Sequence, residues 1–286
     1  MKKLVLTTIM AFALSCVNVD ASMVVLDYIG ETYVTPNNIE RNLIVNSDDG
    51  RAYNISMRPL EEAIRSLDGD FSIPLEYLFI NNTKEDVYFK HQEYSHIFWE
   101  TSMDGVPKNM VAKIKDYGVV PAGTYDILFE VQAVDIETGA IASTSSFNLQ
   151  FIVPIEHEIH TYSETPAINV SAENAFKKLH RNTNETSPMV YIRSNTDWVL
   201  LLDTADFGET IGNYYVTTTS ASDRVTNRLQ EKALITPNRE IILARGKAPA
   251  DNEFVTVEFS VENPSDGALK AGSYENRIRY VLREGD

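Results

Sequence analysis

The chain has 286 residues and carries 41 acidic against 25 basic side chains, for a net charge of −16. So acidic a chain repels nucleic acid and anionic lipid, and we expect neither as a partner. Its length suggests two domains of ordinary size. No run of about 18 apolar residues occurs after the N-terminal segment, so the sequence predicts no membrane span.

The first residues have the three parts of a secretory signal peptide. Two lysines precede an apolar run at residues 4–14, and Val-Asp-Ala at residues 19–21 supplies the short side chains of a cleavage site. We expect residues 1–21 to be removed. Cys16 is the only cysteine, and lipoprotein processing there is the alternative. Cleavage after Ala21 leaves no disulfide, thiolate metal site or cysteine nucleophile.

The early part of the chain alternates strand signals with one helical signal. Residues 43–57 are typical of a strand, a polar turn and a second strand. Residues 59–69 then predict a short helix, because a proline suits its first turn, Gly69 suits its exit, and four apolar side chains share one helical face: Leu60, Ala63, Ile64 and Leu67.

An aromatic-rich segment follows at residues 87–100. Its rings could form a binding face for a ligand such as a sugar, or they could pack in the core or on a sheet face. The candidate binding residues are Tyr88, Phe89, Tyr94, Phe98 and Trp99.

Strict alternation of apolar and polar residues dominates the rest of the chain. After Gly123, apolar side chains recur at every second position through Ala133, and a turn and a returning strand follow at residues 135–153. The same pattern recurs at residues 255–261 and 274–282. Residues 190–203, like residues 43–57, are typical of a strand, a polar turn and a second strand. Trp198 lies inside the apolar second strand, which favours core packing over ligand stacking.

One motif occurs twice, each time opening such a strand. Ala-Gly-Thr-Tyr ends at Tyr125, and Ala-Gly-Ser-Tyr ends at Tyr274. The glycines, Gly123 and Gly272, allow the positive φ of a tight turn, and each tyrosine is expected to bury its ring with a partner for its hydroxyl. Ser47 matches Ser194 at nearly the same offset as the glycines, which indicates a tandem repeat.

These patterns predict an all-β fold of two tandem Ig-like antiparallel β-sandwich domains with minor short helices. The expected division is an N-terminal domain at residues 22–155, a linker at 156–165 and a C-terminal domain at 166–286. Two prolines and alternating charge favour the linker. Residues 171–179 fit a helix or a strand equally well.

The motifs resemble the β-sandwich domains of bacterial secreted surface proteins. Pro-Ala-Gly-Thr-Tyr before a long strand, together with Ser-Asn-Thr-Asp-Trp at residues 194–198, is similar to pilin-like subunits of the spore-coat-U and fimbrial type. That resemblance implies a secreted protein of the periplasm or cell surface of a bacterium, with other protein subunits as partners by strand addition. A glycan or host ligand is a further alternative.

Motifs for catalysis are missing from the sequence, and we expect no enzymatic activity. His157 and His160 stand three apart but lack an obvious third metal ligand. Acidic turns at residues 46–50, 67–72 and 250–253 leave calcium as an alternative, although none has a twelve-residue calcium loop. The sequence therefore predicts no cofactor.

Three functions compete on these grounds. The first is a structural or adhesive surface protein, such as a fimbria-like subunit or a fibre-associated protein. The second is a periplasmic pilus-assembly chaperone, a class that uses cationic residues between its two domains, for which no matching Arg and Lys are recognisable. The third is a carbohydrate-binding β-sandwich module, which needs an aromatic platform such as residues 87–100.

Overall fold

A computed structural model describes residues 24–35, 38–47, 49, 51–82, 84–98, 108–162, 167–168, 179–182, 187–208, 212–263 and 275–285. Several predictions fall outside these residues: the signal peptide with Cys16, Trp99, the possible helix at residues 171–178, and the motif residues Gly272 and Tyr274. Within the described residues no helix is long and apolar enough to cross a membrane.

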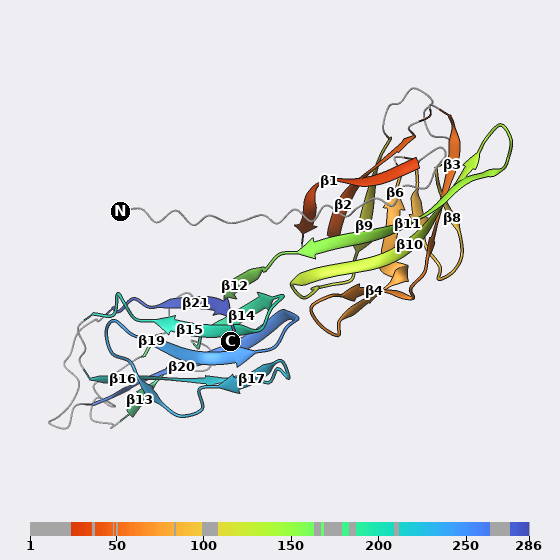
Figure 1. Ribbon diagram of the computed structural model, residues 1–286. Helices are drawn as coiled ribbons and strands as arrows, with labels where there is room; N and C mark the ends of the chain where they lie inside the picture. The colour runs from red at the N-terminus through yellow and green to blue at the C-terminus, as the bar shows by residue number, and fades with distance from the viewer. Residues whose placement is uncertain are drawn as a thin grey trace, which may run out of the picture.

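Figure 1 shows antiparallel strands in two groups. We call residues 24–153 the N-terminal half. Its strands are β1 (Val24–Thr35), β2 (Asn38–Ser47), β3 (Tyr53–Pro59), β4 (Ala63–Ser66), β5 (Ser72–Pro74), β6 (Leu78–Asn81), β7 (Asp86–Tyr88), β8 (Ser95–Phe98), β9 (Lys108–Lys115), β10 (Gly123–Asp135) and β11 (Ile141–Val153). They form sheet 1, ordered β1-β2-β9-β6-β7, and sheet 2, ordered β5-β4-β10-β3-β8 with β11 paired to β10.

Residues 157–285 form the C-terminal half. Its strands are β12 (His157–Thr161), β13 (Leu179–Arg181), β14 (Met189–Ser194), β15 (Trp198–Asp203), β16 (Asn213–Thr219), β17 (Val225–Arg228), β18 (Ala233–Leu234), β19 (Glu240–Gly246), β20 (Ala250–Glu262) and β21 (Arg279–Glu284). Sheet 3 has the order β12-β14-β20-β16-β18, with β13 paired to β20, and sheet 4 has the order β17-β19-β15-β21. The predicted all-β class of antiparallel sheets is confirmed.

The two halves share a strand order. We number the five strands on the main path of each sheet by their order along the chain. In sheet 1 and in sheet 3, the strands then lie side by side in the same order: first, second, fifth, third, fourth. In sheet 2, β3 lies between β8 and β10, just as β15 lies between β19 and β21 in sheet 4. Each half also buries its own cluster of apolar side chains.

The hairpin of β10 and β11 shows why the alternating pattern folds as it does. The strands pair from Gly123 opposite Val153 to Val134 opposite Ile141. Every second side chain of β10 points into the core, and each of these is at most 2% exposed: Tyr125, Ile127, Phe129, Val131 and Ala133. Burying such side chains stabilises a fold by about 1.5–3 kcal/mol each.

The structure confirms the predicted roles of the first repeated motif. Gly123 has φ of +148°, a conformation that favours glycine. The Tyr125 ring is buried, and its hydroxyl donates a hydrogen bond to the carbonyl of Pro121 at 2.8 Å. The neighbouring amide of Thr124 donates to the Asp68 carboxylate at 2.9 Å, which ties the motif to the turn before β5.

Trp198 packs in the core of the C-terminal half, as predicted. It is fully buried at the start of β15 and pairs with Gly246 of β19. A Cβ atom on Gly246 would lie 2.1 Å from Cζ2 of the indole. A glycine at this position therefore makes room for the ring.

The helix predicted at residues 59–69 is wrong. The segment bends after β3, and β4 then pairs with β10 and with β5. Leu60 and Leu67, two of the four predicted helical contacts, are exposed, whereas Ile64 is buried. Strand pairing with distant β10 has overridden the local helical pattern. The described residues contain only a short 3-10 turn at Leu75–Tyr77 and no α-helix.

Part of the segment predicted as a linker is a strand. Residues 157–161 form β12, which pairs with β14 from His157 opposite Ser194 to Thr161 opposite Val190. The connection between β11 and β12 is thus confined to Pro154, Ile155 and Glu156.

Candidate functional site

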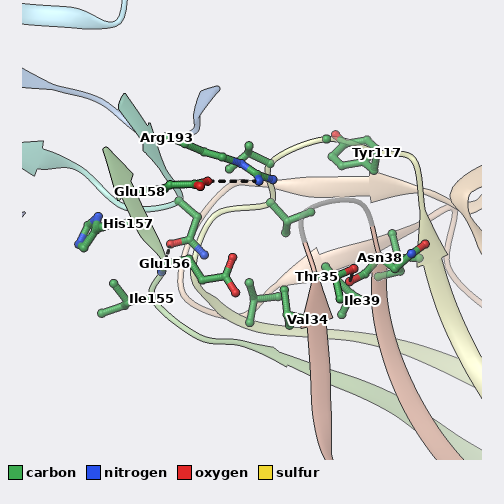
Figure 2. A pocket seen from close by; sticks show the side chains of 16 residues that line it. Val34, Thr35, Asn38, Ile39, Tyr117, Ile155, Glu156, His157, Glu158 and Arg193 are labelled. Atoms are coloured by element: carbon green, nitrogen blue, oxygen red, sulfur yellow. Dashed lines mark hydrogen bonds and ion pairs between the residues drawn. The ribbon is translucent and has the colours of Figure 1, made fainter. Parts of the chain in front are cut away.

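A cavity of about 460 Å³ lies where the two halves meet. Figure 2 shows its walls, which come from both halves and from the connection between them. The apolar lining is contributed mainly by the N-terminal half: Val34, Ile39, Ile114, Val119, Val120 and Val153. The polar lining includes Thr35, Asn38, Tyr117, Glu156, His157, Glu158, Arg193 and Asn195.

Asn195 holds the halves together at one side of this cavity. Its side chain is nearly buried; Oδ1 accepts a hydrogen bond from the Glu156 amide at 2.7 Å, and Nδ2 donates to the Pro154 carbonyl at 2.7 Å. Its backbone carbonyl accepts from the Ala122 amide at 2.8 Å. The turn after β14 is therefore bonded both to the connection and to the residue before Gly123.

The one arginine of the described cavity lining lies close to two carboxylates. Arg193 lies on β14 with Nη1 4.0 Å from Oε2 of Glu158 and Nε 3.8 Å from Oδ1 of Asp251. The sequence alone did not identify a cationic residue between the halves. Only tertiary packing places Arg193 beside the cavity. The described lining contains this one arginine and no lysine, and its guanidinium is already paired.

Among the described residues, two serine hydroxyls lie within hydrogen-bond distance of a histidine. Oγ of Ser194 lies 2.9 Å from Nδ1 of His157, and Oγ of Ser56 lies 2.8 Å from Nδ1 of His96. Both serines are buried, so a substrate cannot reach their oxygen atoms. Ser194 also donates to the Thr196 carbonyl at 2.6 Å, which identifies it as a residue of the turn.

The two linker histidines point away from each other. His157 bonds to Ser194, whereas Nε2 of His160 lies 2.8 Å from Oε1 of Glu158. Burial lowers the pKa of His157, and Glu284 partly offsets that effect. Among the described residues, no three His, Cys, Asp or Glu side chains gather as metal ligands.

The acidic turns use their carboxylates within the chain. Asp49 accepts hydrogen bonds from Oγ of Ser47 at 2.8 Å, from the Arg51 amide at 3.0 Å and from the Tyr53 hydroxyl. Burial acts to raise the pKa of Asp49, but these hydrogen bonds outweigh it and lower the pKa. Residues 250–253, expected to form an acidic turn, instead open strand β20, and Glu253 accepts a hydrogen bond from the Ser222 hydroxyl. Calcium at these positions stays an alternative to the prediction of no cofactor.

The predicted aromatic face is divided between core and surface. Phe89 is buried with its ring 4.9 Å from that of Phe129, and Phe98 packs partly buried against the same core. Tyr88 is exposed on β7 of sheet 1. Tyr94 hydrogen-bonds to Glu130 of β10 in sheet 2. The described members therefore do not share one face, and Trp99 lies outside the described residues.

A second candidate site is the free edge of β21. This strand pairs with β15, and no other described strand pairs with it. Three side chains, one just before β21 and two within it, pack against the core but are only half-buried: Ile278, Tyr280 and Leu282. The Tyr280 hydroxyl is buried without a hydrogen-bond partner among the described residues, and burial raises its pKa.

Comparisons with known proteins find no family. No family model matches the sequence, and no curated protein matches it. Solved structures with some likeness include the CupB6 tip adhesin from Pseudomonas aeruginosa, with 10% identity, a TM-score of 0.32 and coverage of 92% of this chain and 93% of that one. The class 5 fimbriae chaperone CfaA has 11% identity, a TM-score of 0.27 and coverage of 91% and 99%. A mutant of CfaE, the CFA/I adhesin of enterotoxigenic E. coli, has 8% identity, a TM-score of 0.30 and coverage of 91% and 78%. Scores this low do not place the chain in any of these groups.

Proposed function

We propose that this chain is a secreted, non-enzymatic cell-surface protein with a structural or adhesive role, a fimbria-like subunit or a fibre-associated protein. Its partners are other protein subunits, and one of them adds a strand to the free edge of β21. The observation that carries the proposal is that β15 alone among the described strands pairs with β21, whose other edge lies over a half-covered core.

A free edge exposes a row of backbone N–H and C=O groups, and it templates pairing with another chain. An added strand gains its affinity from those backbone hydrogen bonds, and its alternate side chains supply specificity. At β21 such side chains would also cover Tyr280 and Leu282, which adds apolar burial to the backbone pairing.

The N-terminal half supplies the pattern for the added strand. There β11 runs antiparallel along β10 and places Leu149, Phe151 and Val153 in the core. By the matching strand orders, β21 holds the position of β10. We propose that the halves are two tandem domains of one architecture, divided at residues 154–156, and that the partner strand has the alternating apolar pattern of β11.

Strand acceptance by β21 is tested by fusing a copy of the β11 strand to the C-terminus. Residues 141–153 are repeated at the C-terminus behind a flexible Gly/Ser linker, and a control fusion carries serine at the copies of Leu149 and Phe151. We expect the apolar fusion alone to raise the thermal midpoint of the C-terminal half, protect the amides of β21 from hydrogen exchange and reduce self-association. Equal midpoints and exchange rates for the two fusions would contradict strand acceptance.

Cellular location is tested separately. Gold-labelled antibody to the protein should decorate filaments in a sheared surface fraction. Label confined to the periplasm would oppose the fibre proposal and favour the second candidate, a pilus-assembly chaperone. That candidate is supported by Arg193, which lines the cavity between the halves, where a partner's terminal carboxylate could displace Glu158. Loss of capture of a pilin subunit on Arg193→Ala, with filaments unlabelled, would establish it.

A further inference from the structure

Three aromatic side chains form a row on the outer face of sheet 3. The ring centroids of Tyr162 and Tyr191 lie 4.8 Å apart, and those of Tyr191 and Phe254 lie 6.0 Å apart. We call these three residues the aromatic strip. Tyr162 is 78% exposed, and the other two are half-buried. Exposed aromatic rings gathered in this way mark binding surfaces more often than isolated ones do.

Strand register fixes the strip in place. His160 of β12 stands opposite Tyr191 of β14, and Tyr191 stands opposite Phe254 of β20. The Tyr162 amide donates to the Met189 carbonyl at 3.2 Å, so Tyr162 continues the outer face of β12. Val190, next to Tyr191, points into the core. The rings are therefore held on a paired three-strand platform.

Charged groups border the strip at one end. Glu158, opposite Arg193 in the register, lies two residues before His160 on the same face of β12. Arg193 reaches between Glu158 and Asp251 at 4.0 and 3.8 Å. Because Glu158 and Arg193 also line the cavity between the halves, the strip and the cavity form one continuous surface.

From this juxtaposition we propose that the aromatic strip binds a neutral oligosaccharide. A pyranose presents an apolar face of C–H groups and an edge of hydroxyl groups. The Tyr162 and Tyr191 rings are inclined at 64° to each other, so two successive sugar rings stack on them, one on each tyrosine. The sugar hydroxyls bond to the carboxylates and guanidinium at the strip's end. A net charge of −16 disfavours sulfated or sialylated chains.

The border of the strip fits the hydroxyl groups of a sugar. Its two carboxylates accept hydrogen bonds and its arginine donates them. The strip lies on sheet 3 and β21 lies in sheet 4, so the inference goes beyond strand acceptance and does not depend on it.

The experiment titrates the full chain with cellotetraose and chitotetraose, followed by calorimetry and by amide NMR shifts. We expect one of these sugars to bind, and Tyr162→Ala and Tyr191→Ala each to weaken it about tenfold or more. The matched control is Tyr88→Ala, which removes another exposed tyrosine, 56% exposed on sheet 1. The control should bind as tightly as the unchanged protein.

Several outcomes would overturn the proposal. They are the absence of binding by either sugar at millimolar concentration, binding that only Tyr88→Ala weakens, and preference for an anionic polymer such as heparin. A partner protein that loses affinity on Tyr162→Ala while neither sugar binds would assign the strip to protein docking instead. The exchange protection of β21 in the strand fusion is unaffected by any of these results, so each proposal can fail alone.

Discussion

The strands β10 and β21 occupy matching positions in two sheets, yet their surroundings differ. β10 pairs with β11 along one edge and with β3 and β4 along the other, whereas β21 pairs with β15 alone among the described strands. The inward side chains of β10 are completely buried, while Tyr280 and Leu282 of β21 are half-buried.

This difference shows which strands the fold requires. Both halves hold a core between two sheets, so a covering strand is not required for the architecture. In the N-terminal half, β11 covers the outer edge of β10. In the C-terminal half, no described strand covers the outer edge of β21, so its backbone groups and apolar side chains are available to a partner. Under the proposed function, the outer edge of β21 is therefore the feature that a partner binds.

Truncating an inward side chain in each strand should give the largest contrast. Phe129→Ala in β10 is expected to cost about 3–5 kcal/mol, because it empties a fully buried site. Leu282→Ala in β21 should cost about 1 kcal/mol, because its side chain already contacts solvent. Hydrogen exchange of the amides in β3 measures the stability of the N-terminal half, and exchange in β15 measures that of the C-terminal half. Equal costs would show that the edge of β21 is covered.

The connection between the halves should be the next most sensitive region. Asn195→Ala removes the side chain that bonds to Pro154 and Glu156, leaving the Glu156 amide without its acceptor. We expect a loss of about 2 kcal/mol and faster proteolysis at residues 154–156. Asn148→Ala, which removes an exposed hydrogen bond to Asp126, is the control and should change stability by less than about 0.5 kcal/mol. Proteolysis at the same rate in both variants would refute this role of Asn195.

Removal of the hydroxyl group from Tyr125 and from Tyr280 should change stability in opposite directions. Tyr125→Phe removes a hydroxyl bonded to Pro121 and should cost about 1 kcal/mol. Tyr280→Phe removes a buried hydroxyl that has no partner among the described residues, and should stabilise the isolated protein by about 1 kcal/mol. Chemical denaturation followed by exchange in each half measures both. Destabilisation by Tyr280→Phe would reveal an acceptor for that hydroxyl.

The strands and the Gly123 motif could be predicted because their causes are local. Alternation identified the inward residues of β10, and the sterics of glycine identified the turn before it. The helix at residues 59–69 was predicted wrongly because its stripe of apolar residues is also local, whereas its true partner, β10, lies some 60 residues further on.

The candidate sites could not be found in the same way. The cavity joins residues from β1, β9, β12 and β14, and only tertiary packing brings them together. The aromatic strip depends on the register between β12, β14 and β20, which places Tyr191 beside Phe254. The edge of β21 lacks a second partner among the described strands, and the alternating sequence of the strand does not reveal which neighbours it has.

The smallest expected contrast is the pH response of β12, which lies beside β21. Burial lowers the pKa of His157 below its ordinary value of about 6.5, with Glu284 of β21 acting in the opposite direction. The unfolded chain therefore takes up a proton before the folded chain does. Stability that is complete above about pH 6.5 should decline as the pH falls below it, until the folded state is protonated too.

His157→Gln should flatten this decline between about pH 5 and 7 in denaturation curves of the C-terminal half. The carboxylates with lowered pKa, such as Asp49 and Asp197, lose their stabilisation only below about pH 4, so they do not obscure the window. An unchanged slope in His157→Gln would locate the pH response elsewhere. A slope that disappears in the apolar strand fusion would show that covering β21 also alters the surroundings of His157 in β12.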